Sequence, residues 1–160
     1  MGINNNSEPF KMKKQELYKE FGMDEFYWGD SFIVDRDRAS SDIIKDIDNI
    51  CVSENRNPLA NKWNELNFSE CSELLLNAFN FDLAYTGCEI MPTEKAEYYR
   101  DLLTSKFKES DTKCFTNWSQ SPWKSKNGAG WDPITDNTFD MAIVFVDDLK
   151  IAFTYFISED

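Results

Sequence analysis

The chain has 160 residues, 41% of them apolar and 15% aromatic, which is enough for one domain, 1–160, with a buried core. Its 29 acidic residues outnumber 17 basic ones, and the net charge of −12 argues against binding nucleic acid or an anionic membrane, because phosphate contacts need clustered Lys and Arg. The absence of histidine removes the commonest general base, the commonest zinc ligand and every Ser-His or Cys-His pair. We therefore expect a protein that offers negative charge to a basic partner, not an enzyme.

The first quarter of the chain mixes polar and apolar segments. Residues 1–8 are polar and are expected to be loosely ordered. Apolar residues that share one face predict a helix over 9–21, where a proline suits the first turn. Two short runs of aromatic and β-branched residues, 26–28 and 32–34, predict strands.

Two amphipathic helices are predicted next. One follows a cap at Ser40 or Ser41, and the other is capped by Ser69. The buried stripe of the first consists of Ile43, Ile44, Ile47, Ile50 and Cys51, and that of the second of Cys71, Leu75, Ala78 and Phe79. Between them, Pro58 is expected to start a short helix.

The region from residue 83 to residue 108 predicts a strand and then a helix. A strand is expected over 83–91, bent at Gly87. Pro92 and Thr93 then introduce a helix with apolar residues three and four apart, an acid in its first turn and lysines in its last.

The last third of the chain predicts a β-hairpin. Residues 110–136 are polar and lack apolar periodicity, whereas 139–146 and 150–157 have the composition of strands joined by a turn at Asp147-Asp148. The first strand is apolar on both faces and is expected inside a sheet. The whole pattern predicts an α+β fold, with several helices packed on an antiparallel sheet that ends in a C-terminal β-hairpin.

The cysteines predict a reducing compartment. Cys51, Cys71, Cys88 and Cys114 form no Cys-x-x-Cys pair, and the polar N-terminus has no apolar signal segment. No run reaches the roughly 18 apolar residues of a membrane-spanning helix. We expect free, mostly buried thiols in a cytoplasmic protein with no membrane segment, and the oligomeric state is left open.

The negative charge is concentrated in two blocks that we expect to meet a basic partner. Residues 22–103 hold 17 acids and seven bases, and residues 127–160 hold seven acids and one base, whereas residues 104–126 are net basic. Such blocks steer a basic partner, and tryptophans in polar loops are frequent anchors of interfaces. The predicted partner-binding residues are Asp35, Asp37, Asp132, Asp136, Asp140, Asp147, Asp148, Trp123 and Trp131. Covering the core is the alternative role for the tryptophans.

Motifs for metal, cofactor or catalytic chemistry are weak in this chain. Asp46 and Asp48 lie two residues apart on a predicted helix, so they point in different directions and are expected to be solvated. No hard oxygen cage for a metal ion accompanies them, or Asp35 and Asp37. The glycines of 127–130 follow no strand and lack the spacing of a phosphate-binding loop. We predict no cofactor, no metal ion and no catalytic residue.

The start of the predicted hairpin resembles a known family signature. This segment reads Trp131-Asp132-Pro133-Ile134-Thr135-Asp136-Asn137-Thr138-Phe139-Asp140. It is similar to a pattern in immunity proteins of contact-dependent growth inhibition and related polymorphic toxin systems, over residues 131–160. The resemblance implies a cytoplasmic bacterial antitoxin that binds one toxin domain, often a nuclease, and blocks its active site or substrate path. It also implies that Asp136 and Thr138 pin the turn into the sheet and that Trp131 covers the sheet edge.

Two other functions remain open at this point. An acidic inhibitor of the phage type would mimic DNA with carboxylates at phosphate-like spacing and bind several unrelated DNA-binding proteins. A small carboxylate-based hydrolase would need two acids that converge in a deep pocket.

Overall fold

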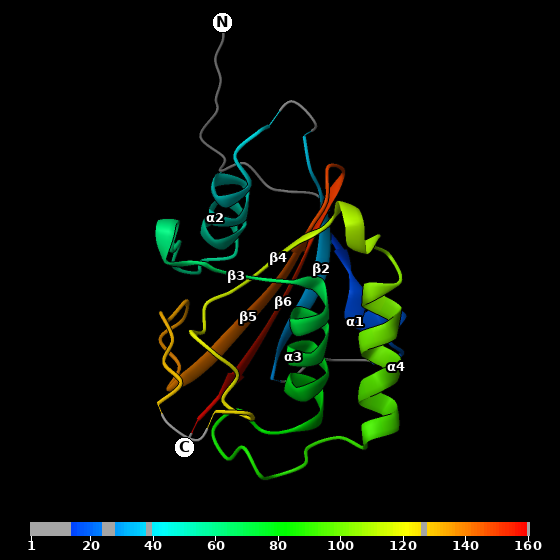
Figure 1. The fold of residues 1–160 in the computed structure, drawn as a ribbon, viewed down its shortest axis with the longest axis vertical. Coiled ribbons are helices and arrows are strands. Elements are labelled where there is room, and N and C mark those ends of the chain that lie inside the picture. The colour runs from blue at the N-terminus through cyan, green and yellow to red at the C-terminus, as the bar shows by residue number, and fades with distance from the viewer. Residues whose placement is uncertain (1–13, 24–27, 38–39, 126–127, 160) are drawn as a thin grey trace, which may run out of the picture.

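The computed structural model describes residues 14–23, 28–37, 40–125 and 128–159 (Figure 1). The segment 1–8, the predicted helix start at Pro9, part of the run 26–28 and part of the glycine segment 127–130 lie outside the described residues. Within them, helices pack on a six-stranded antiparallel sheet, which confirms the predicted α+β class.

The sheet is built around the C-terminal hairpin. Its strands are β1 (Lys14–Glu16), β2 (Gly29–Asp35), β3 (Asn64–Leu66), β4 (Lys113–Thr116), β5 (Phe139–Val146) and β6 (Lys150–Ser158). Neighbouring strands follow the order β1-β2-β6-β5-β4-β3, and every pair is antiparallel. β5 and β6 form the predicted hairpin, with Ala142 opposite Tyr155. β5 lies between β4 and β6, and a core on each side of the sheet buries both of its faces, as its continuous apolar run predicts.

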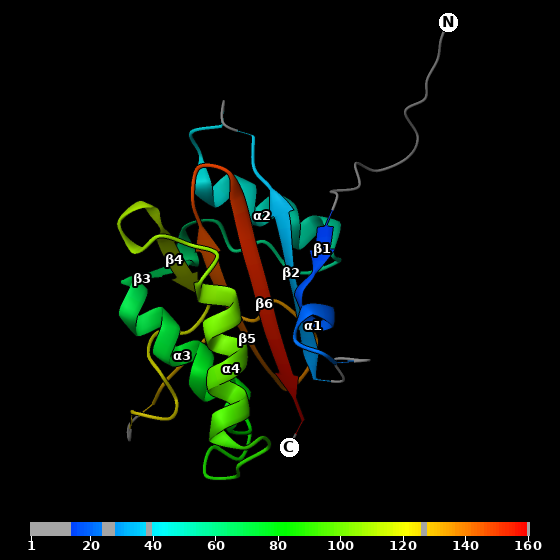
Figure 2. The ribbon, with the colours of Figure 1, turned by 90° about the vertical axis from the view of Figure 1, so that its right-hand side faces the viewer.

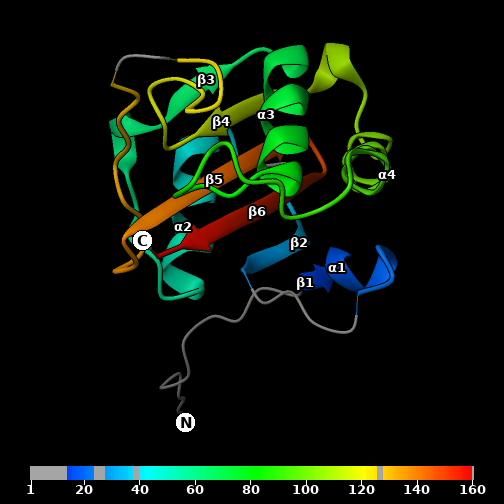
Figure 3. The same cartoon turned by 90° about the horizontal axis from the view of Figure 1, so that it is seen from below.

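Helices cover both faces of this sheet. They are α1 (Leu17–Glu20), α2 (Ile43–Ser53), α3 (Phe68–Asn80) and α4 (Thr93–Thr104), with short 3-10 turns η1 (Ala60–Lys62) and η2 (Glu109–Asp111). α1, α3 and α4 lie on one face and α2 on the other (Figures 2 and 3). Successive side chains of β5 point to opposite faces of the sheet and so enter two different cores. Met141, Ile143 and Phe145 face α3 and α4, whereas Ala142, Val144 and Val146 face the side of α2.

The helix starts differ from the predicted ones by a few residues. α2 is capped by Asp42, whose side chain accepts the N–H of Lys45, and not by Ser40 or Ser41. α3 is capped by Asn67 in a capping box with Glu70, which makes Ser69 a residue of the first turn. In both helices, the residue whose side chain accepts the N–H of the third helical residue stands directly before the first helical residue.

Three predictions of local structure are wrong. Residues 83–91 form no strand but a compact loop, because its N–H groups find acceptors nearby, as in the bond from Cys88 to the Tyr85 carbonyl. Of the predicted helix over 9–21, the described part is strand β1 followed by the single turn of α1. The lack of apolar periodicity in residues 110–136 predicts no strand there, but strand β4 lies within this segment.

The cysteine prediction is confirmed for the thiols themselves. All four cysteines are free; Cys51, Cys71 and Cys114 are buried and Cys88 is exposed. Burial raises the pKa of the Cys51 thiol to about 12, which keeps it protonated and unreactive. None of the helices within the described ranges has the length and apolar character needed to cross a membrane.

Candidate functional site

The predicted partner-binding residues fall into two groups at opposite ends of β5. Asp147 and Asp148 follow its C-terminal end, whereas the motif of residues 131–140 leads into its N-terminal end. The eight residues of the strand separate the ends by roughly 23 Å at 3.3 Å per residue. The nine residues therefore do not form one site.

The first group, which we call the acidic tip, consists of Asp35, Asp37, Asp147, Asp148 and Leu149. It joins the C-terminal end of β2 to the turn between β5 and β6, because Asp35 lies opposite Lys150 and the N–H of Arg36 donates to the Leu149 carbonyl at 2.8 Å. Both segments meet at the upper end of the sheet in Figure 1. Two acidic segments more than a hundred residues apart in the sequence thus share one surface.

Arg36 anchors the tip from beneath. Its side chain is only 6% exposed, and its guanidinium donates to the Asp46 carboxylate at 2.8 Å and to the carbonyls of Ser40 and Asp147. The bond to Asp46 neutralises this cation and ties α2 to the tip. The expectation that Asp46 is solvated is therefore wrong, since Asp46 also accepts the Ser40 hydroxyl.

Asp147 shapes the turn of the hairpin. Its carboxylate accepts the N–H groups of Leu149 and Lys150 at 2.8 Å each and the Lys150 ammonium at 2.7 Å. Partial burial opposes ionisation, but these bonds outweigh it and hold the pKa of Asp147 below its usual range. Most of the acceptor capacity of Asp147 is thus used within the turn.

The remaining acids of the tip face outward. Asp35, Asp37 and Asp148 are exposed, and Leu149 beside them is 47% exposed. An exposed apolar side chain among carboxylates offers a partner an apolar contact surrounded by charge. This arrangement can attract a basic protein surface and hold it with an apolar contact.

The second group, the motif end (residues 131–140), is organised around Asp140. This carboxylate is completely buried and accepts four donors: Asn117 Nδ2 at 2.8 Å, the N–H groups of Ile134 and Thr135, and the Thr135 hydroxyl at 2.7 Å. Because it is enclosed and saturated with donors, Asp140 is not available to a partner. We correct its predicted role: it pins the loop before β5.

Asn117 completes this network and carries no signal in the sequence. Its amide donates to the Asp140 carboxylate and to the Asp132 carbonyl, and its oxygen accepts the N–H of Ala142 at 2.7 Å. It is a buried polar residue just beyond β4, in the stretch predicted to be loop. Its role follows only from the pairing of β4 with β5.

The two tryptophans predicted to bind a partner, Trp123 and Trp131, pack on the structure. Trp131 stacks between Trp118, at a centroid distance of 4.5 Å, and Phe139, at 5.2 Å. Trp123 is half-buried and its indole N–H donates to the Asp82 carbonyl. Their main contacts are therefore those of residues that cover the core, the alternative left open by the sequence.

Of the two residues that the resemblance implies pin the turn, Thr138 has that role and Asp136 lies on the surface. Asp132 is half-buried and Asp136 is exposed, whereas Thr138 bonds through its N–H and hydroxyl to the Glu159 carboxylate. The pinning of the turn thus comes from Asp140 with Thr135 on one side and from Thr138 with Glu159 on the other. These bonds lower the pKa of Glu159, the one from the Thr138 hydroxyl most.

Asp48 also has an internal role that the sequence did not reveal. Its carboxylate accepts the N–H groups of Leu59 and Ala60 and the indole N–H of Trp63, at 2.8 to 3.0 Å. It is therefore not merely solvated: it ties the segment after α2 to that helix.

Acids also converge at the edge strand β1. The Lys14 ammonium lies 2.9 Å from Glu54, 3.3 Å from Glu16 and 3.6 Å from Asp30. Partial burial, then the hydrogen bond and charge of Asp30, raise the pKa of Glu16 to about 6. Within the described residues, no group of three or more His, Cys, Asp or Glu is arranged to hold a metal ion.

Comparisons with known proteins found no relative of this chain. No family model matches the chain, and no curated protein and no solved structure matches it either.

Proposed function

We propose that this protein is a stoichiometric inhibitor, an immunity protein of a polymorphic toxin system, that binds a basic toxin domain of the nuclease type through the acidic tip. One observation carries the proposal: two acidic segments distant in sequence converge around a half-exposed leucine at one end of the sheet. The net charge of −12 and the motif of residues 131–140 support the same class.

Binding would combine fast approach with a small apolar anchor. Exposed carboxylates at Asp35, Asp37 and Asp148 attract a cationic surface and raise the association rate. Leu149, at the apex of the turn, supplies the contact that loses water on binding. A nuclease must expose cations where it binds phosphate, so a tip that fits those cations covers the substrate path.

The motif end has a different role in this proposal. Its polar groups bond to one another and set the loop that enters β5, so this part maintains the fold whatever the partner. The tip would then select the toxin. The compartment that fits the proposal is the cytoplasm, where free thiols persist and where a nuclease toxin acts.

Co-expression with the toxin domain encoded immediately upstream tests the function. We expect cell survival and a 1:1 complex in which amide exchange slows at residues 35–37 and 147–149. If the toxin domain still kills the cells although this protein is abundant and soluble, the proposal is wrong. Equal binding to several unrelated DNA-binding proteins would instead identify an acidic DNA mimic.

A further inference from the structure

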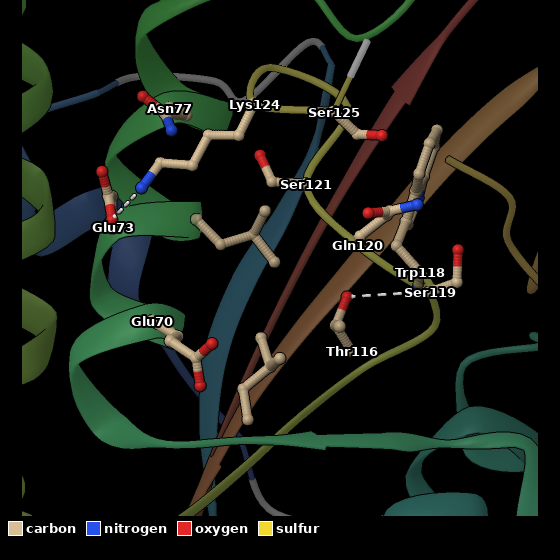
Figure 4. Close-up of a pocket in the computed structure, with 12 residues that line it drawn as sticks. Glu70, Glu73, Asn77, Thr116, Trp118, Ser119, Gln120, Ser121, Lys124 and Ser125 are labelled. Atoms are coloured by element: carbon tan, nitrogen blue, oxygen red, sulfur yellow. Dashed lines mark hydrogen bonds and ion pairs between the residues drawn. The ribbon is translucent and has the colours of Figure 1, made fainter. Parts of the chain in front are cut away.

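A cavity lies between α3 and the segment that follows β4, on the face of the sheet opposite α2 (Figure 4). Its volume is about 300 Å³, at the lower end of the range of small-ligand pockets. Leu66, Leu74 and Trp118 supply apolar surface to its lining. None of the predicted partner-binding residues lines it.

The wall formed by α3 carries acceptors at helical spacing. Glu70, Glu73 and Asn77 are three and four residues apart, which places them on one face of the helix. Across the cavity, residues 119–121 contribute hydroxyl and amide groups (Figure 4). An apolar lining with convergent polar groups is the arrangement expected of a binding site.

Lys124 spans the cavity from the opposite segment. Its ammonium lies 2.6 Å from the Glu73 carboxylate, so its methylene stem crosses the space between the two walls (Figure 4). Both side chains are about half exposed, at 59% and 49%, and an exposed ion pair of this kind contributes little and is readily exchanged. Among the residues that line the cavity in the described structure, Lys124 is the one cation.

We propose that this cavity binds an aliphatic organic cation, a primary ammonium or guanidinium group on a methylene chain. The cation replaces the Lys124 ammonium at Glu73, and the methylene chain lies against Leu66 and Leu74. In the free protein, the side chain of Lys124 thus occupies the position that the ligand takes when it binds. The inference does not rest on the proposed toxin partner; the same chemistry is offered by a free diamine and by an arginine or lysine side chain of a protein.

The test is a titration of the full chain, followed by amide chemical shifts, with agmatine as the probe. Shifts are expected at residues 70–77 and 116–125. Glu73→Gln removes a charged acceptor that is half exposed and weakens binding about threefold. Lys124→Ala removes the internal competitor and tightens binding about threefold. Glu97→Gln, on the exposed surface of α4 and outside the cavity lining, removes the same charge and changes binding less than twofold.

Three results overturn the inference: no shifts at the cavity at millimolar probe, equal weakening by Glu73→Gln and Glu97→Gln, or weaker binding to Lys124→Ala. Thermal unfolding of each variant confirms that the fold is kept. Spermidine and a capped arginine amide separate the sources of the cation. Tighter binding of spermidine identifies a free polyamine, and equal or tighter binding of the arginine amide identifies a protein side chain. Because no toxin is present, failure here leaves the proposed function untouched.

Discussion

Asp140, at the N-terminal end of β5, is completely buried and accepts four donors, whereas Asp148, just beyond the C-terminal end of the same strand, is exposed. The acids at the two ends belong to the same acidic block of the sequence. What separates them is the supply of donors: the loop of the motif end folds back on Asp140, whereas the N–H groups of the turn at the tip donate to Asp147. A carboxylate enclosed by donors fixes structure, and one left on the surface is available to a partner.

Removing the carboxylate of Asp140 should have the largest effect. Asp140→Ala leaves the donors of Asn117 and Thr135 buried without an acceptor, so we expect the free energy of unfolding to fall by about 3 to 5 kcal/mol. Asp136→Ala, in the same motif but exposed, should change it by less than about 0.5 kcal/mol. Urea unfolding of both variants measures the difference. Equal stability of the two variants would contradict the structural role assigned to the buried carboxylate of Asp140.

Neutralising the tip should slow association with the toxin domain. We expect Asp35→Asn with Asp148→Asn to lower the on-rate about fivefold at low salt, because steering depends on exposed charge near the contact. The matched control, Asp132→Asn with Asp136→Asn, removes two charges at the motif end. Stopped-flow mixing at about 50 and 500 mM salt measures both. A larger loss from the control pair would move the contact face to the motif end.

Glu16 tests the link between hydrogen-bond donors and the role of a carboxylate, because its own carboxylate is partly buried with too few donors. One of its carboxylate oxygens is buried without a hydrogen-bond partner, and its pKa is raised to about 6. The folded state therefore holds the proton of Glu16 more tightly than the unfolded chain, so the contribution of Glu16 to stability rises as pH falls from above 6 to about 4.5. Allowing for solvent screening, we expect a gain of roughly 0.5 to 1 kcal/mol over that interval.

Glu16→Gln should remove this pH dependence, because the amide resembles the protonated acid. At pH 7.5 the variant should be more stable than the native chain by the same amount, and at pH 4.5 the two should agree. Glu65→Gln, exposed on the other edge strand β3, is the control and should keep the native pH profile. Urea unfolding across this pH range checks the expectation, which fails if Glu16→Gln follows the native curve.

Elements with strong local signals were predictable. α2, α4 and the β5–β6 hairpin follow from apolar spacing, from the helix start at Pro92 and Thr93, and from a turn between two strand-like runs, since each of these is set by residues close in sequence. β3 and β4 have three and four residues and little pattern of their own. β4 is a strand because β5 offers it a partner, and β3 is one because β4 does, and local sequence contains neither condition.

The sequence alone determined the class of fold, the excess of negative charge, the exclusion of histidine chemistry and the turn at Asp147. The tertiary structure decided which acids lie on the surface. Asn117 reaches Asp140 across 23 residues, and Arg36 reaches the Asp147 carbonyl across 111. Whether a carboxylate is exposed depends on the donors that fold around it, and those of Asp140 come from the loop before β5 and from Asn117, just beyond the neighbouring strand β4. Composition therefore predicted an acidic protein, and only the packing separated the acids of the tip from those that hold the loop.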